Sequence, residues 1–134
     1  QLHRFRVLPI VNGNDTTVTD EIQFGDNDLL AAKLAKIFKA DLLIMLSAVE
    51  GLYESFNDQT NQSTLIRQVS KVTKDIHAMA GKASKSGKGG MTSKIEAAKI
   101  MLSMNSDMVI TKGDAANPLI TLKKSVQSTW FNKA

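Results

Sequence analysis

Cysteine is absent from the 134-residue chain, and histidine is limited to His3 and His77. A chain without cysteine forms no disulfide and offers no thiolate ligands to zinc or iron–sulfur centres. Two histidines are too few to build a metal site from imidazoles. We therefore expect no metal centre that is held by the protein's own side chains.

Long apolar runs are also missing, since the longest one covers only residues 42–46. A helix needs about 20 apolar residues to cross a bilayer, and no segment near the start resembles a signal peptide. These absences exclude a membrane protein and predict a cytoplasmic one. Apolar residues make up 43% of the chain and charged residues 22%, which is typical of a globular domain and argues against a disordered chain, a collagen or a coiled coil.

Charges of one sign are absent or scarce in two stretches of the chain. Residues 14–28 contain five acids and no lysine or arginine, whereas residues 82–99 contain five lysines and one acid. Two regions of opposite charge suit a ligand that carries both signs, such as a metal–nucleotide complex. A solvated surface is the simpler alternative. Nucleic acid would also be attracted, but no aromatic residue is interleaved with the lysines for base stacking, and we predict no nucleic-acid partner.

Short apolar segments alternate with segments of helical periodicity. Predicted strands cover residues 5–11, 42–46, 65–72, 107–111, 119–122 and 126–131, and predicted helices cover 26–40, 74–80 and 92–104. On the first helix, one face carries Leu30, Leu34, Ile37 and Phe38 at helical spacing. The alternation predicts an α/β fold, a three-layer αβα sandwich with a largely parallel sheet. Ligands bind such sheets at the carboxyl ends of the strands, which directs attention to residues 12–15, 47–51 and 112–113.

The first polar motif is Asp26-Asn27-Asp28, which follows Gly25 at a predicted helix start. One such residue is enough to cap a helix, so a simple cap is the plain alternative. A helix N-terminus also attracts anions, and an aspartate there can bind a ligand cation or hold a lysine in place.

The second motif covers residues 86–94, SGKGGMTSK, just before a predicted helix. Glycines let the backbone N–H groups approach phosphates, and lysine supplies charge against a transferring phosphoryl group. The order GxxxxGK[ST] of a Walker A loop is absent. A flexible linker remains the alternative. A third segment, residues 46–53, is by itself only a strand followed by a turn.

Taken in order, these motifs resemble those of the amino-acid kinase family over essentially the whole chain. Residues 9–15, PIVNGND, resemble the P-[IV]-[IV]-N-E-N-D segment of the family members that phosphorylate glutamate, and residues 24–28 resemble their GDND signature. Residues 40–53 resemble the family's ADLLILLTDVDGLY strand, residues 87–98 its GTGGM loop, and residues 128–131 the G-T-x-F near the domain's end.

The resemblance implies an amino-acid kinase fold and ATP-dependent phosphorylation of the γ-carboxylate of L-glutamate, with Mg²⁺. The product would be glutamyl 5-phosphate, in the first step of proline synthesis, and the protein would form a homo-oligomer. The site residues that the resemblance implies are catalytic Lys94 and Asp28, glutamate-binding Asp15, Asn27 and Asn12, and ATP-binding Ser47, Ala48, Lys88, Gly89, Gly90, Met91, Thr92, Ser93 and Lys94.

The chain departs from the family pattern at several positions, among them Thr92-Ser93, which stands where a small residue followed by threonine is usual. Gly13 stands where glutamate is usual, Ala48 where aspartate is usual and Lys88 where threonine is common. Nothing matches the first half of the family's domain, so we interpret residues 1–134 as its C-terminal, nucleotide-binding portion, without a second domain and inactive alone. The alternatives are a kinase for acetylglutamate, the kinase part of a bifunctional pyrroline-5-carboxylate synthase, and a non-catalytic module that binds an amino acid or a nucleotide.

Overall fold

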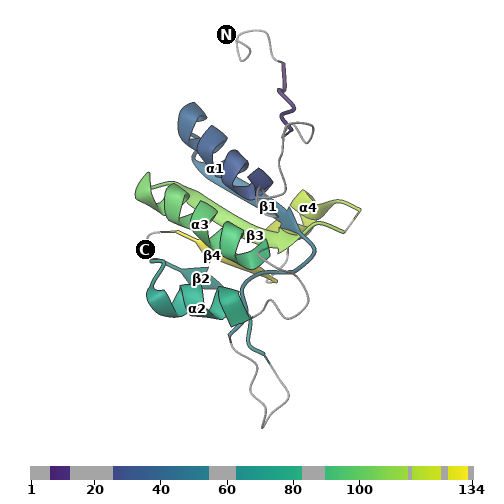
Figure 1. The fold of residues 1–134 in the computed structure, drawn as a ribbon. Coiled ribbons are helices and arrows are strands. Elements are labelled where there is room, and N and C mark those ends of the chain that lie inside the picture. Colours follow the sequence, from purple (N-terminus) through teal and green to yellow (C-terminus); the bar gives the residue numbers. More distant parts are fainter. Residues whose placement is uncertain are drawn as a thin grey trace, which may run out of the picture.

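The computed structural model describes residues 7–12, 26–54, 63–82, 90–114, 116–124 and 127–132 (Figure 1). Along the chain its elements are α1 (Asp26–Phe38), β1 (Leu42–Ser47), β2 (Gln68–Val69), α2 (Lys74–Lys82), α3 (Gly90–Ser103), β3 (Asp107–Lys112), α4 (Pro118–Lys124) and β4 (Ser128–Phe131). The predicted helices at 26–40, 74–80 and 92–104 and the predicted strands at 42–46 and 107–111 are confirmed with small shifts of their ends.

The four strands form one sheet in the order β1-β3-β4-β2. β1 runs parallel to β3 and β2 runs parallel to β4, while β3 and β4 are antiparallel. The α/β class and the largely parallel sheet that the sequence predicts are therefore confirmed.

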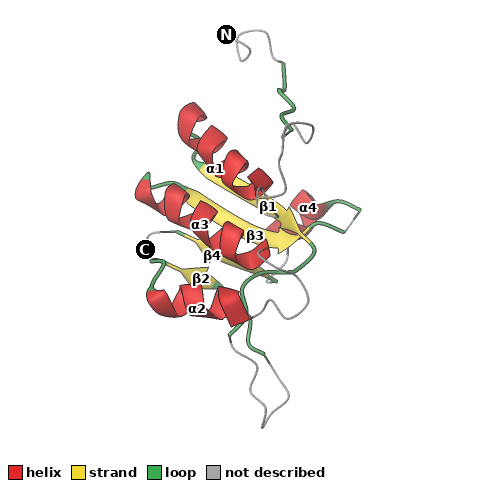
Figure 2. Ribbon diagram, viewed as in Figure 1, coloured by secondary structure: helices red, strands yellow, loops and turns green. Residues whose placement is uncertain are grey.

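The helices α1, α3 and α2 lie side by side on one face of this sheet (Figure 2). Met45 of β1 and Met108 and Ile110 of β3 join the core beneath these helices. Side chains alternate across a strand, and Leu42 and Leu46 of β1 are 39% and 50% exposed. Among the described residues, α1, α3 and α2 form a helical layer on one face of the sheet. A second helical layer on the other face, which would complete the three-layer sandwich, stays a prediction.

The two helix-to-strand connections, α1–β1 and α3–β3, have the same geometry. Each helix is followed by a residue of positive φ, Lys39 at 52° and Asn105 at 57°. Around Lys39, the amide of Ala40 donates to the carbonyl of Ala35, and around Asn105 the amide of Ser106 donates to Met101. This is the Schellman pattern, which satisfies the last carbonyls of a helix and reverses the chain sharply. Each strand therefore runs back along its own helix.

Small side chains fill the core between α1 and α3. Ala32 and Ala35 are the buried apolar residues of α1, and Ala97 and Ala98 of α3 belong to the same core cluster. Alanine lets two helices approach more closely than leucine or phenylalanine does. The predicted apolar face of α1 is wrong at its C-terminal end, because Ile37 and Phe38 are 72% and 55% exposed.

Three predicted strands differ from the structure. Residues 119–122 form part of helix α4 instead, because Pro118 begins that helix with its fixed φ and the amides of Ile120 and Thr121 donate to the carbonyl of Asn117. Within the described residues of segment 5–11, from residue 7 onward, the backbone is in no strand. In segment 65–72 only Gln68–Val69 is a strand, with an isolated bridge between Tyr53 and Leu65.

Candidate active site

The carboxyl ends of β1 and β3 lie next to the N-termini of α1 and α3. α1 and α3 have 13 and 14 residues, and β1 and β3 have six each, so every one of these elements is about 20 Å long. Since each strand runs back along its helix, it ends where the helix began. The two strands end together, with Ser47 opposite Lys112 and the amide of Gly113 donating to the carbonyl of Ser47 over 2.8 Å.

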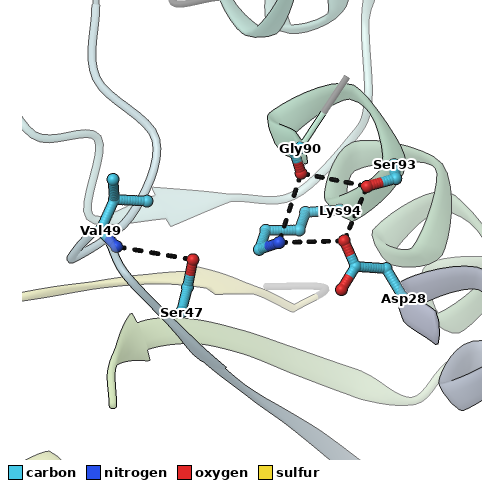
Figure 3. A network of polar contacts seen from close by, with 6 residues as sticks. All are labelled: Asp28, Ser47, Val49, Gly90, Ser93 and Lys94. Carbon is cyan, nitrogen blue, oxygen red and sulfur yellow. Dashed lines mark hydrogen bonds and ion pairs between the residues drawn. The ribbon is translucent and has the colours of Figure 1, made fainter. Parts of the chain in front are cut away.

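A carboxylate–lysine pair joins the first turns of α1 and α3 at this edge. The Nζ of Lys94 lies 2.9 Å from the Oδ2 of Asp28 and 3.3 Å from the carbonyl oxygen of Gly90 (Figure 3). The hydroxyl of Ser93 lies 2.6 Å from the same Oδ2. The structure therefore brings the two predicted catalytic residues into direct contact.

The pair is partly shielded from water. The Lys94 and Asp28 side chains are 14% and 23% exposed, whereas the ion pair of Lys99 with Glu96 on the same helix spans 3.9 Å and leaves Lys99 64% exposed. Shielding strengthens a charge interaction because the effective dielectric constant falls. The ammonium is thus held more firmly than an ordinary surface lysine, yet it retains access to a ligand.

Ser47 and Ala48 continue the same edge from β1. Ser47 Oγ accepts a long hydrogen bond of 3.5 Å from the amide of Val49, and Figure 3 shows it on the β1 side of the cluster. Ala48 is exposed and has no polar side chain to offer a ligand. The serine is therefore the polar side chain that β1 itself contributes at its end.

Lys112 lies at the end of β3, at a position that the sequence singles out without assigning it a role. Its Nζ is 3.0 Å from the Oδ2 of Asp114, and this carboxylate raises the pKa of Lys112. The feature of the sequence that indicates a possible functional role for Lys112 is its location at the end of a predicted strand. The Lys112 backbone lies beside that of Ser47, because the two residues are in register.

Beyond β1, the phenol of Tyr53 donates a hydrogen bond to Glu50 Oε2. This bond, assisted by burial and by the negative charge of Glu50, raises the pKa of Tyr53 to about 12. The turn between β1 and the Tyr53–Leu65 bridge is thereby fixed by a side-chain contact that the sequence pattern did not reveal.

The remaining predicted residues fall into two groups. Asn12 and Asn27 are exposed, and Met91 and Thr92 are half-buried in the first turn of α3. Asp15, Lys88 and Gly89 lie outside the described residues. The binding roles of these residues, and of Ser47, Ala48 and Gly90, stay predictions.

No group of three or more histidine, aspartate or glutamate side chains is placed to hold a metal ion in the part of the chain that the structure describes. No helix there combines the length and the apolar character needed to span a membrane.

The structure is thus an α/β protein with a shielded lysine–carboxylate pair at the carboxyl ends of its parallel strands, where α/β sheets bind their ligands. Residues 1–112 match the model of the amino acid kinase family. The chain belongs to that family.

Known proteins similar to this chain agree with the family. Glutamate 5-kinase of Nitrobacter winogradskyi is 45% identical over 98% of the chain, and that of Rhizobium johnstonii is 42% identical over 98%. The chain spans about a third of the length of these curated relatives, 35% and 34% respectively.

Two solved structures share the fold. Carbamate kinase from Giardia lamblia, bound to AMP-PNP, has a TM-score of 0.57 at 22% identity, covering 81% of this chain and 36% of that protein. UMP kinase from Ureaplasma parvum has a TM-score of 0.51 at 17% identity, covering 79% of this chain and 41% of that protein.

Proposed function

We propose that the intact protein, meaning the natural polypeptide that contains these residues, transfers the γ-phosphoryl group of ATP to the γ-carboxylate of L-glutamate. The observation that carries the proposal is the pair formed by Asp28 and Lys94 at 2.9 Å. The identity of 42–45% with glutamate 5-kinases over nearly the whole chain supports the choice of substrate. We assign residues 1–134 to the nucleotide side of the kinase domain.

Lys94 supplies a positive charge to the transferring group. Its ammonium has three N–H bonds, and among the described residues it donates to Asp28 Oδ2 and to the Gly90 carbonyl. One N–H is left for a phosphoryl oxygen. The N-terminus of α3, which begins at Gly90, adds the positive end of a helix dipole. Phosphoryl transfer depends mainly on such positioning and charge neutralisation.

The proposed reaction needs no general base, because a carboxylate is already ionised at neutral pH. An oxygen of the glutamate γ-carboxylate forms the new bond to the γ-phosphorus. The bond from that phosphorus to the β,γ-bridging oxygen breaks, and ADP leaves with the electron pair. Asp28 acts by holding the Lys94 ammonium in place, and Asn12, Asp15 and Asn27 would bind glutamate.

Magnesium would enter with the nucleotide. Mg²⁺ is commonly held by substrate phosphates, water and one or two carboxylates. That mode of binding fits a site whose described residues contain no cluster of three candidate ligands. A cytoplasmic location and a homo-oligomer stay predictions.

An assay of the intact protein with magnesium ATP tests the proposal. The acyl phosphate product is trapped with hydroxylamine, and L-glutamate is compared with N-acetylglutamate at equal concentration. Product with L-glutamate and little with N-acetylglutamate is the expected result. A preference for N-acetylglutamate would make the protein an acetylglutamate kinase, and no product with either would favour a binding module, so each of these outcomes overturns the proposal.

A further inference from the structure

Ser93 of α3 faces Asp28 of α1 across the contact between the two helices. Its Oγ lies 2.6 Å from Asp28 Oδ2 and 3.0 Å from the carbonyl oxygen of Gly90. The residue is 8% exposed. The hydroxyl therefore lies in the contact between the two helices and is largely covered.

The hydroxyl has a single hydrogen to donate, and two acceptors compete for it. The Asp28 carboxylate is charged and 0.4 Å closer than the Gly90 carbonyl, and hydrogen bonds to ionised acceptors are both shorter and stronger. The hydrogen is therefore directed to Asp28. A hydroxyl committed in this way has no hydrogen left for a nucleotide phosphate.

Ser93 and Lys94 converge on one oxygen although they are consecutive on a helix. Neighbouring helical residues point about 100° apart, so their meeting at Oδ2 requires Asp28 to lie between the two side chains. Lysine has a flexible four-carbon stem and by itself fixes a partner poorly. Serine has one rotatable bond to its oxygen and therefore supplies the rigid contact.

From this geometry we infer that Ser93 is a positioning residue, which fixes the Asp28 carboxylate and through it the Lys94 ammonium, and that it is not a ligand of the nucleotide. The predicted role of Ser93 in ATP binding is replaced by this assignment. The kinetic part of the inference rests on the proposed function, because it needs the phosphoryl transfer as its readout.

Kinetics of the intact protein separate the two roles. Ser93→Ala is expected to lower kcat about 10- to 100-fold, since small displacements of a catalytic group have effects of this size, and to leave KM for ATP within about twofold. Ser93→Thr, which retains the hydroxyl, is expected to restore most of the activity. Ser103→Ala is the matched control, because Ser103 on the same helix also donates to the carbonyl three residues earlier, over 2.6 Å, but contacts no carboxylate among the residues that the structure describes.

Chemical labelling of Lys94 gives a readout that does not depend on glutamate phosphorylation. An amine-reactive acylating reagent, with mass spectrometry of each peptide, measures how fast Lys94 reacts. Faster labelling is expected in Ser93→Ala, with wild-type rates in Ser93→Thr and Ser103→Ala, because only the first variant loosens Asp28. If the wild-type protein fails to phosphorylate glutamate, the proposed function falls while this experiment still decides the role of Ser93.

Three results would overturn the inference. A raised KM for ATP with an unchanged kcat would make Ser93 a nucleotide ligand. Equal kcat losses in Ser93→Ala and Ser93→Thr would show that the hydroxyl itself does not matter. Lys94 labelling that is the same in wild type and Ser93→Ala would show that Ser93 does not hold the pair.

Discussion

The Asp28 carboxylate accepts a hydrogen bond from the Lys94 ammonium over 2.9 Å although 66 residues separate them. Their proximity follows from two helix–turn–strand units that pack in parallel, so that the first turns of α1 and α3 coincide. Asp28 belongs to α1 and Lys94 to α3, so the pair forms only when the two helices pack against each other. Formation of the pair therefore depends on the correct packing of the two helix–turn–strand units.

Lys94→Ala is expected to lower glutamate phosphorylation by the intact protein about 100- to 1,000-fold, the usual effect of removing one group that stabilises transition-state charge. Steady-state assays at saturating ATP measure it. Lys99→Ala, on the same helix and exposed, should retain wild-type activity. Equal activities of the two variants would show that Lys94 has no catalytic role.

Gly51→Ala is expected to destabilise the intact protein by about 1–3 kcal/mol, the usual cost of overpacking. A Cβ on Gly51 would lie 2.2 Å from Thr129 Oγ1 and 2.9 Å from the Thr129 amide nitrogen. Thr129 cannot move away easily, because its hydroxyl accepts from the Leu52 amide and donates to the Ile66 carbonyl.

Gly81→Ala is the matched control for Gly51, because a Cβ added at Gly81, in the last turn of α2, meets no atom of the described residues within 4 Å apart from its own chain neighbours and the backbone of its helix. Alanine is favoured over glycine by about 1 kcal/mol in a helix interior, but Gly81 is the residue before the last of α2, so this variant should be about as stable as wild type. Thermal unfolding midpoints compare the two. A Gly51→Ala variant as stable as Gly81→Ala would contradict the packing around Thr129.

Lys39→Gly is expected to stabilise the protein by about 1 kcal/mol. Lys39 has a φ of 52°, which strains a residue with a Cβ but not glycine. Asn105→Gly should give a smaller gain, because asparagine tolerates the left-handed region at its φ of 57°. Denaturant unfolding measures both free energies. A loss of stability in Lys39→Gly would show that the Schellman turn does not control the α1–β1 connection.

The Tyr53 phenol is expected to titrate near 12 rather than near 10. Because its pKa is higher in the folded protein than in the unfolded chain, the contact with Glu50 contributes to stability fully below pH 10. That contribution is lost as the pH rises from about 10 to about 12. The difference between wild-type and Tyr53→Phe ultraviolet absorbance isolates this tyrosine. Glu50→Gln should return its pKa toward 10, and a wild-type value already near 10 would refute the contact.

The sequence predicts well those elements whose pattern is local. The apolar runs at β1 and β3 have polar residues on both sides, and α3 has a buried face that includes Ile95, Ala98 and Leu102 as its spacing predicts. The sequence-based prediction is wrong at residues 119–122, because a run of four mostly apolar residues fits a strand or a helix equally well. There the cap at Asn117 and the proline at 118 decide for a helix.

For the candidate site, too, the sequence indicates which residues are involved, and the structure shows which of them are in contact. The motif resemblance predicts Asp28 and Lys94 as a functional pair, and the structure places them in contact. The resemblance also predicts Ser93 as an ATP ligand, which stays a prediction, and the structure shows the Ser93 hydroxyl donating to Asp28. A one-dimensional pattern records which residues are present, and it does not record which acceptor a hydroxyl meets across a helix contact.

The sequence by itself determined the α/β class and the helix and strand periodicities, because these depend on side chains close together in the chain. Its resemblance to the amino-acid kinase family singled out Asp28 and Lys94, which lie far apart in the sequence. Only the tertiary structure decided the antiparallel pairing of β3 with β4, the contact between α1 and α3, and the shared oxygen of Ser93 and Lys94. Each of these joins groups that are distant in sequence, and their distances depend on how the helices dock on the sheet.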